Sequence, residues 1–266
     1  MTPRNRTPGE GTRVVHAGLP GPEAGTPFLP GPVFAAPYHL PGDPHAAPYG
    51  YGRFGNPTWS AYEAAIGELE GGEALVFASG MAACTAVLSR LRPGDLLVAS
   101  ADGYPTVRAV ATEYLAPRGV RTRFVPTGEI AEAVGGAALV WVETPANPAL
   151  GVCDIAEVVR AADAPVVVDN PGLASAPGAE IAARQMRRFG PVVSFDLETR
   201  ERAERFLGAL ELVREATSFG GLHSTAERRA RWDQGDDVSE GFIRLSCGCE
   251  DTADVLADVA AALALA

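Results

Sequence analysis

The chain contains no lysine: all 22 of its basic residues are arginine. This excludes any mechanism that needs a lysine amine, because a guanidinium stays protonated and is not nucleophilic at neutral pH. Long hydrophobic runs are also missing, and none approaches the roughly 18 residues that cross a bilayer. The polar, Pro- and Gly-rich start, residues 1–11, lacks the apolar core of a signal peptide. We therefore expect a cytoplasmic protein without a membrane partner.

Cysteine is scarce, with four residues in 266, which is too few for a disulfide framework in a chain of this length. Cys247 and Cys249 are separated by one residue, not by the two that are typical of zinc sites, and no histidine lies near them. We interpret both as strand residues and predict no metal site.

Basic residues are outnumbered by 33 acidic residues, which gives a net charge of −11. An acidic chain without a basic run binds a phosphate backbone poorly, so we expect no nucleic-acid partner. The 47% hydrophobic and 21% charged residues are typical of a globular protein with one large domain or two unequal ones.

The spacing of apolar residues predicts an arm followed by alternating strands and helices. Residues 1–50 are rich in proline and glycine and predict an extended arm. Residues 51–170 predict a large domain with a mostly parallel sheet, because continuous apolar strands alternate with helices. The strands are expected at 74–78, 96–100, 122–126, 138–143 and 165–169, and the helices at 61–70, 81–91, 107–115 and 155–162.

Residues 171–266 predict a smaller α/β domain. After a loop at 171–180, the pattern indicates helices at 181–188, 199–211 and 252–265 and strands at 192–197 and 242–247. We find no internal repeat.

Several short motifs could bind an anion. Ser79, Gly80 and Met81 lie where a predicted strand passes into a helix, and free N–H groups at a helix start favour a phosphate. A simple turn that needs glycine explains the same residues. Tyr51 and Arg53 could reach a phosphate together.

Three further residues lie at predicted strand ends or inside a strand. Asp169 ends an apolar strand, where it could hold a protonated heterocyclic nitrogen or cap the next helix. Asn147 follows another strand, in a loop that prolines could brace without any function. Arg244 interrupts an apolar strand, so we expect either a carboxylate substrate or an internal Asp or Glu as its partner.

In this order, the motifs resemble those of the Cys/Met-metabolism family of pyridoxal-phosphate enzymes, which includes cystathionine γ-synthase, cystathionine lyases and methionine γ-lyase. The resemblance begins at about Thr12 and extends to the C-terminus. It implies an α/β, aspartate-aminotransferase-like fold (PLP fold type I) and usually a tetramer of tight dimers. The motifs are TRVVHAG, YGRFGNPT, ASGMAA, DGY, ETPANP, VVVDN, TSFGG and IRLSCGCED.

The resemblance also implies roles for these residues. Gly80 and Met81, with Ser79 beside them, would bind the cofactor phosphate, and Tyr51 and Arg53 would reach the phosphate of the neighbouring subunit. Tyr104, the one catalytic candidate, would stack on the pyridine ring, and Asn147 would lie near the phenolic oxygen of that ring. Asp169 would pair with the ring nitrogen. Arg244, helped by the backbone around Ser218, would bind the substrate α-carboxylate.

The chain departs from the family pattern after Asn170. In the family, a long stretch with the Schiff-base lysine follows, whereas here Pro171 leads almost at once into sequence typical of the small domain. We infer an internal deletion at Asn170–Pro171. The lost stretch should contain sheet strands, so we expect an uncovered sheet edge and uncovered apolar faces unless a partner covers them.

Two functional hypotheses follow. The chain is either a sulfur-amino-acid lyase or γ-synthase with impaired catalysis, binding pyridoxal 5'-phosphate noncovalently if at all, or a pseudo-enzyme. The pseudo-enzyme would bind the cofactor or pair with a full-length relative, and its Tyr51 and Arg53 would complete the neighbour's site. A gene remnant that barely folds is a third alternative.

Overall fold

The structure is a computed structural model that describes residues 8–169, 179–186, 190–232 and 238–266. The chain divides into two compact units, residues 1–83 and residues 84–266, which we call the arm unit and the core unit. Each is described by itself. The predicted division into 1–50, 51–170 and 171–266 stays a prediction.

The arm unit is built around helix α2, Pro57–Glu70. Its start is encoded locally, because the Asn56 side chain accepts a hydrogen bond from the backbone of Thr58 and Pro57 occupies the first turn. Its end is set by Gly71, whose φ of 76° lies in the left-handed region. The arm is not wholly extended as predicted, because it contains helix α1, Glu10–His16, and a 3₁₀ turn, Pro44–Ala46.

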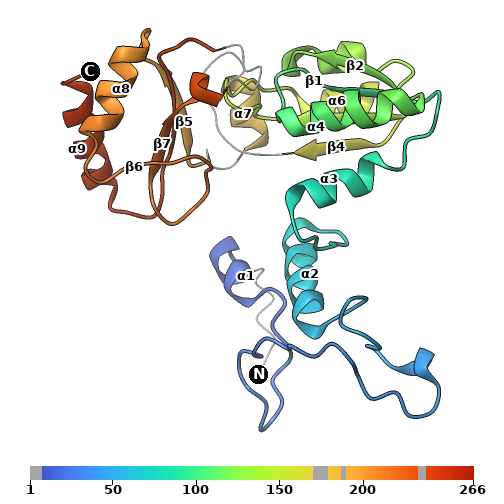
Figure 1. Cartoon of the computed structure of the whole chain (residues 1–266). Helices are drawn as coiled ribbons and strands as arrows, with labels where there is room; N and C mark the ends of the chain where they lie inside the picture. Colours follow the sequence, from blue (N-terminus) through green and yellow to red (C-terminus); the bar gives the residue numbers. More distant parts are fainter. Residues whose placement is uncertain (1–7, 170–178, 187–189, 233–237) are drawn as a thin grey trace. The chain divides into compact units, whose positions relative to one another are not determined.

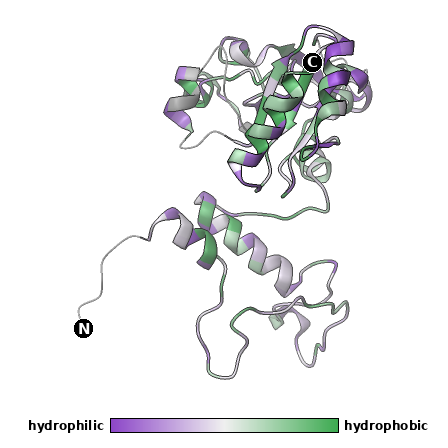
Figure 2. Cartoon of the chain, turned by 90° about the vertical axis from the view of Figure 1, so that its left-hand side faces the viewer, coloured by the Kyte–Doolittle hydropathy of each residue, from purple (hydrophilic) through white to green (hydrophobic). Residues whose placement is uncertain are grey.

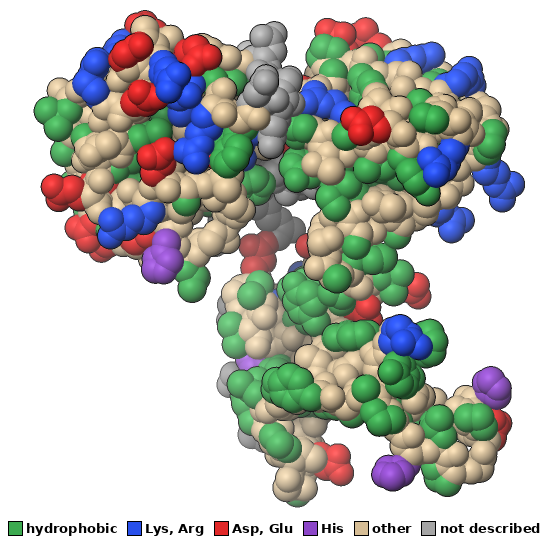
Figure 3. All heavy atoms as spheres, viewed as in Figure 1, with side chains coloured by type: hydrophobic (Ala, Val, Ile, Leu, Met, Phe, Trp, Pro, Cys, Tyr) green, Lys and Arg blue, Asp and Glu red, His purple; other side chains and the backbone are tan. Residues whose placement is uncertain are grey.

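The strand predicted at 74–78 does not form. These residues are extended but have no strand partner among the described residues, and the backbone N–H of Val76 instead donates to the Glu63 carboxylate of α2 at 2.9 Å. Leu75, Val76 and Phe77 stay 78%, 41% and 43% exposed. Helix α3, Gly80–Leu88, follows directly. Figure 3 shows many hydrophobic side chains on the visible face of the arm unit.

The core unit begins with a sheet of four parallel strands in the order β2-β1-β3-β4 (Figure 1). All residues of β1 and β3 are buried, as expected for central strands covered on both faces. The strands β2 and β4 each have a partner on one side only among the described residues, and the edge expected from the deletion stays a prediction. The strands are β1 (Leu96–Ser100), β2 (Arg121–Val125), β3 (Leu139–Glu143) and β4 (Val166–Asp169).

The segments between these strands are mostly helical. They comprise α4 (Pro105–Ala109), which continues as a π-helix (Val110–Leu115) and a 3₁₀ turn (Ala116–Arg118), a further 3₁₀ turn (Thr127–Glu129), α5 (Ile130–Ala133) and α6 (Ile155–Ala161). Helix α7 (Ala179–Gln185) follows the undescribed residues 170–178. The predicted helix–strand alternation is therefore confirmed.

A second sheet in the order β5-β8-β7-β6 forms the C-terminal half of the core unit. Its central pairings, β5 with β8 and β7 with β8, are antiparallel. The strands are β5 (Val192–Asp196), β6 (Arg214–Glu215), β7 (Thr225–Arg228) and β8 (Phe242–Ser246), and the helices are a 3₁₀ turn (Arg229–Trp232), α8 (Arg200–Ala209) and α9 (Thr252–Leu263).

Helices α8 and α9 pack together beside this sheet and supply its core (Figure 1). Phe206 of α8 is fully buried and meets Phe195 of β5 edge to face, with 5.4 Å between ring centroids. Ile243 and Leu245 of β8 belong to the same core. Figure 2 shows hydrophobic residues on the strands of the core unit and a mixture of hydrophobic and hydrophilic residues on its helices.

Two strands of this half were missed, and one expectation about it is wrong. Strands β6 and β7 were not predicted, because they are short and carry charged residues. Cys247 and Cys249 lie beyond the end of β8 at Ser246, so they are not strand residues. No group of metal-binding side chains occurs among the described residues. None of the described helices is both long enough and apolar enough to cross a membrane.

Candidate active site

The carboxyl edge of the parallel sheet carries three of the predicted site residues. Tyr104 follows β1, Asn147 follows β3, and Asp169 is the last residue of β4, in register with Glu143 at the end of β3. Parallel strands present their carboxyl ends on one side, where α/β proteins bind ligands. The Asp169 side chain lies outside what the structure describes, and so does the Asn170–Pro171 junction.

Tyr104 is fixed through its backbone and leaves its ring accessible. Its N–H donates to the buried Glu143 carboxylate, and Pro105 begins helix α4 directly after it. The Tyr104 side chain is 43% exposed. An anchored backbone with an accessible aromatic face suits stacking on a planar ring.

Asn147 lies in a tightly bonded loop between β3 and α6. The Thr144 hydroxyl accepts a hydrogen bond from the backbone of Cys153, and the N–H of Ala146 donates to the carbonyl of Gly151 at 2.7 Å. Asn147 itself is only 7% exposed. Burial is the main cause of a raised pKa for the Cys153 thiol, so this cysteine is inert at neutral pH.

Arg244 lies on β8 with its side chain directed away from the hydrophobic core. Because strand side chains alternate, Ile243 and Leu245 enter the core and Arg244 occupies the opposite face. Its Nη1 donates to the Asn147 amide oxygen at 2.8 Å, and its Nη2 donates to the Glu227 carboxylate. An internal glutamate is therefore one partner of this 4% exposed arginine, which was one of the two alternatives expected.

Ser218 lies beside the guanidinium of Arg244. Ser218 adopts a φ of 78°, which is uncommon for a residue with a side chain, and its carbonyl oxygen lies 3.5 Å from Nη2 of Arg244. The guanidinium carbon of Arg244 also lies 5.1 Å from the ring centroid of Phe219. The structure thus brings Asn147, Ser218 and Arg244 together.

The Ser79–Met81 turn belongs to the arm unit. The Ser79 hydroxyl accepts a hydrogen bond from the N–H of Ala82 at 3.1 Å, so Ser79 caps helix α3. A Cβ placed on Gly80 would meet nothing within 4 Å, which leaves the helix start open. Ser79 and Gly80 also line a groove of about 290 Å³ beside α2.

Tyr51 and Arg53 form a second pair in the arm unit. The guanidinium carbon of Arg53 lies 4.8 Å from the Tyr51 ring centroid and 5.1 Å from that of Phe54. The phenol and the guanidinium are therefore adjacent, as two groups that bind one phosphate must be.

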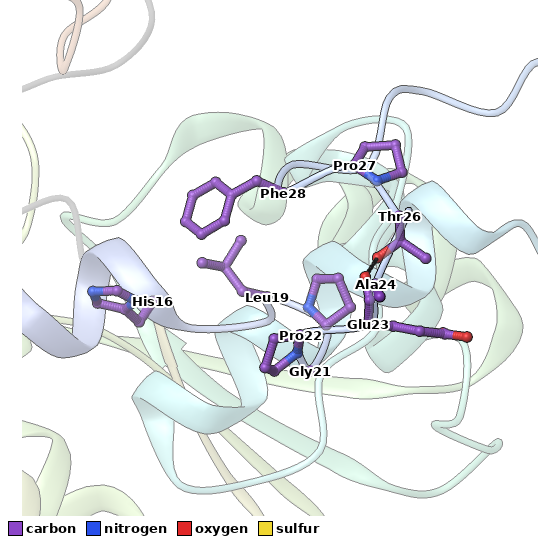
Figure 4. A pocket seen from close by; sticks show the side chains of 10 residues that line it. His16, Leu19, Gly21, Pro22, Glu23, Ala24, Thr26, Pro27 and Phe28 are labelled. Carbon is purple, nitrogen blue, oxygen red and sulfur yellow. Dashed lines mark hydrogen bonds between the residues drawn. The ribbon is translucent and has the colours of Figure 1, made fainter.

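A larger hollow of about 620 Å³ lies elsewhere in the arm unit and contains none of the predicted site residues. Figure 4 shows Leu19 and Phe28 facing one another across it and Glu23 at its far end. Its lining between His16 and Phe28 is mostly proline, glycine and apolar side chains, and it contains no arginine.

Sequence reasoning missed Glu227, which lies beside Arg244. Glu227 lies on strand β7, which was not predicted because two of its four residues are charged. Without the strand, nothing in the sequence places this carboxylate opposite Arg244.

Comparison with known proteins identifies relatives along the whole chain. A cystathionine gamma-lyase of Bacillus subtilis is 26% identical, and the match covers 95% of this chain and 98% of the relative. Among solved structures, metB from Corynebacterium glutamicum is 25% identical with a TM-score of 0.87, covering 97% of this chain and 98% of that one. The methionine gamma lyase CalE6 of Micromonospora echinospora is 27% identical with a TM-score of 0.82, covering 95% and 98%.

A protein of Streptomyces coelicolor with the provisional name cystathionine gamma-lyase is 41% identical, over 96% of this chain and 94% of the relative. Its alignment spans 373 positions, 107 more than the 266 residues of this chain, so a large part of the relative has no counterpart here.

The family model described as Cys/Met metabolism PLP-dependent enzyme matches residues 33–171 and 166–264. The two matches meet at 166–171, where the sequence predicts the internal deletion. The fold class and the family resemblance are thereby confirmed, and the chain belongs to the Cys/Met-metabolism family of enzymes that depend on pyridoxal phosphate.

Proposed function

We propose that this chain binds pyridoxal phosphate noncovalently, receives the α-carboxylate of a sulfur amino acid at Arg244, and has impaired lyase or γ-synthase activity. The observation that supports it best is the buried contact of Arg244 with Asn147, which follows the carboxyl end of β3. A buried guanidinium beside an amide suits a carboxylate, because charge-assisted hydrogen bonds to a guanidinium can be bidentate.

Each unit, taken by itself, contains residues that would suit one part of the cofactor. The N–H groups of Gly80 and Met81 at the open start of α3, with Ser79, would hold the phosphate, and the accessible ring of Tyr104 would stack on the pyridine. Asp169 would pair with the ring nitrogen. A Schiff-base amine is missing, since the sequence has no lysine.

Pyridoxal phosphate, when bound, supplies an electron sink for bonds at the amino acid's α-carbon. The residues of this chain would contribute binding and orientation: Arg244 holds the carboxylate, and Glu143 fixes the backbone that positions Tyr104. No lysine amine can move a proton between substrate atoms, and an arginine stays protonated. We therefore expect slow turnover at best.

A second candidate is a non-catalytic subunit that pairs with a full-length relative. The adjacent Tyr51 and Arg53 favour it, because the family resemblance implies that this pair acts on the neighbouring subunit's phosphate. Such a subunit could complete its neighbour's site without a lysine of its own. We also propose a cytoplasmic location and an oligomer, formed either by copies of this chain or together with a full-length relative.

Absorbance titration tests the first candidate. Purified protein is titrated with pyridoxal phosphate and then with cysteine or cystathionine, and Arg244→Met serves as the variant. We expect saturable cofactor binding in both proteins and a further spectral change with amino acid in the wild type alone. Absence of saturable binding in the wild type would refute the proposal.

Mixing with a lysine-bearing relative tests the second candidate. If this chain completes the neighbour's site, the mixture exceeds the activity of the relative alone, and Arg53→Met in this chain removes the gain. No gain on mixing would contradict the subunit hypothesis.

A further inference from the structure

Glu227 occupies a buried position directly opposite Arg244. The two residues are paired in register on the antiparallel strands β7 and β8, so their side chains lie on the same face of the sheet. Ser194 of β5 is the register partner of Arg244 on its other side, and its hydroxyl donates to the carbonyl of Pro148 at 2.9 Å. This face therefore meets the loop that contains Asn147.

Three donors converge on the Glu227 carboxylate, which is 1% exposed. Arg244 and Arg229 both donate to Oε1, the latter at 3.0 Å, and the indole N–H of Trp232 donates to Oε2 at 2.7 Å. A buried carboxylate with three donors cannot turn away without leaving its charge uncompensated. Glu227 is thus a fixed element of the structure.

Two further contacts of Arg244 are to neutral groups. Asn147 offers an amide oxygen at 2.8 Å and Ser218 a carbonyl oxygen at 3.5 Å. The bond to Glu227 adds the Coulomb attraction between opposite charges, which is strong in a buried site, whereas the bonds to the neutral oxygens of Asn147 and Ser218 lack it. An arriving carboxylate would therefore displace Asn147 or Ser218 from Arg244 more readily than Glu227.

We propose that Glu227 is a positioning residue that holds Arg244 in place to receive the α-carboxylate of the amino-acid substrate. This rests on the proposed role of Arg244. Glu227 does not touch the substrate, and its effect passes through the guanidinium, which it holds at the face that meets the Asn147 loop.

Two substitutions of Glu227 distinguish an effect of its charge on Arg244 from an effect of side-chain packing alone. Glu227→Gln keeps the size of the side chain and removes its charge, whereas Glu227→Asp keeps the charge and shortens the side chain. In the presence of pyridoxal phosphate, calorimetric titration with L-cystathionine should give roughly tenfold weaker affinity for Glu227→Gln. Glu227→Asp should stay within about threefold of the wild type. The matched control Glu240→Gln, which removes the carboxylate that pairs with Arg228, should leave the affinity unchanged.

Affinity of Glu227→Gln within twofold of the wild type would overturn the proposal, as would a larger loss in Glu227→Asp than in Glu227→Gln. If Glu227→Gln does not fold, Trp232→Phe replaces it, because it removes one donor from Glu227 and keeps the charge. That variant should bind about threefold more weakly, and unchanged affinity would overturn the proposal.

Chemical modification gives a reading that needs no cofactor. The rate at which phenylglyoxal modifies Arg244, measured by mass spectrometry of peptides, should rise at least fivefold in Glu227→Gln and little in Glu227→Asp. If the wild type binds no amino acid, the proposed function is refuted. The rate at which phenylglyoxal modifies Arg244 then tests by itself whether Glu227 holds Arg244 in place. An unchanged rate with normal amino-acid affinity would refute the anchor and leave the proposed function standing.

Discussion

Substitution of Asp258 on α9 tests how much its hydrogen bonds stabilise the second sheet. Its carboxylate accepts three consecutive backbone N–H groups of the turn before β6: Glu211 at 2.8 Å, Leu212 at 3.1 Å and Val213 at 2.9 Å. The next strand begins at Arg214, and Val213 is buried in the core of this sheet. Asp258 thus connects the last helix to the start of the β6–β7 segment that carries Glu227.

The Asp258→Asn variant removes the charge and one acceptor oxygen. Hydrogen bonds to a charged group contribute about 1.5–3 kcal/mol each. Asp258 is only half-buried, so water screens most of this gain, and asparagine keeps one carbonyl oxygen. We therefore expect the free energy of unfolding at pH 7 to fall by about 1–2 kcal/mol.

The effect should depend on pH in a defined direction. Desolvation raises the pKa of Asp258, but the three backbone N–H groups outweigh it and lower the pKa below its usual value. A carboxyl with a lowered folded-state pKa stabilises the protein above its unfolded pKa, about 3.9. This stabilisation disappears as pH falls through the folded pKa. The difference in the free energy of unfolding between the wild type and Asp258→Asn should have its full value at pH 7. It should fall toward zero as the solution becomes acidic.

Urea unfolding followed by circular dichroism at pH 7, 5 and 3 measures the difference. Asp254→Asn, on the same helix, is the control and should change stability by less than about 0.5 kcal/mol. A difference between Asp258→Asn and the wild type that is the same at all three pH values would refute the electrostatic account, and so would an equal loss in the control.

Three further outcomes follow from the sequence and the structure. Borohydride reduction of the protein with pyridoxal phosphate should leave no cofactor on any internal side chain, because no lysine exists; peptide mass spectrometry would reveal a contrary label. Thiol titration should modify the exposed Cys249 well before Cys153, whose burial raises its pKa, and equal rates would contradict the buried loop. Phe206→Ala should lower the free energy of unfolding by about 3–5 kcal/mol in urea denaturation, because the side chain is fully buried; a loss below 1 kcal/mol would disprove its place in the core.

Local sequence signals predicted the helices and the parallel strands well. The strand at Leu96–Ser100 has the predicted bounds, and the predicted helix at 61–70 corresponds to α2, which begins slightly earlier at the Asn56 cap. These elements carry their own signals, either a buried apolar run or a capping residue. Strand β7 has neither signal, because two of its four residues are charged, so it was missed.

The candidate site was predictable in part. Arg244 stood out as a charge in an apolar strand, and the expectation of an anionic partner is confirmed by Glu227. The partner's identity depends on the register of β7 against β8, a long-range property that a single strand's sequence does not contain. The predicted roles of Tyr51, Ser79 and Asp169 stay predictions.

The failed strand at 74–78 shows why the helix after it could be predicted and the strand itself could not. A helix satisfies its hydrogen bonds within its own residues, so α3 at Gly80–Leu88 needs no hydrogen-bond partner from another segment. A strand needs a neighbour for its N–H and C=O groups. Among the described residues 74–77 have no strand partner and β4 lacks one on one side, while the two family matches meet at 166–171. An apolar pattern is therefore not sufficient for a strand, because a strand also needs a neighbouring strand as its hydrogen-bond partner.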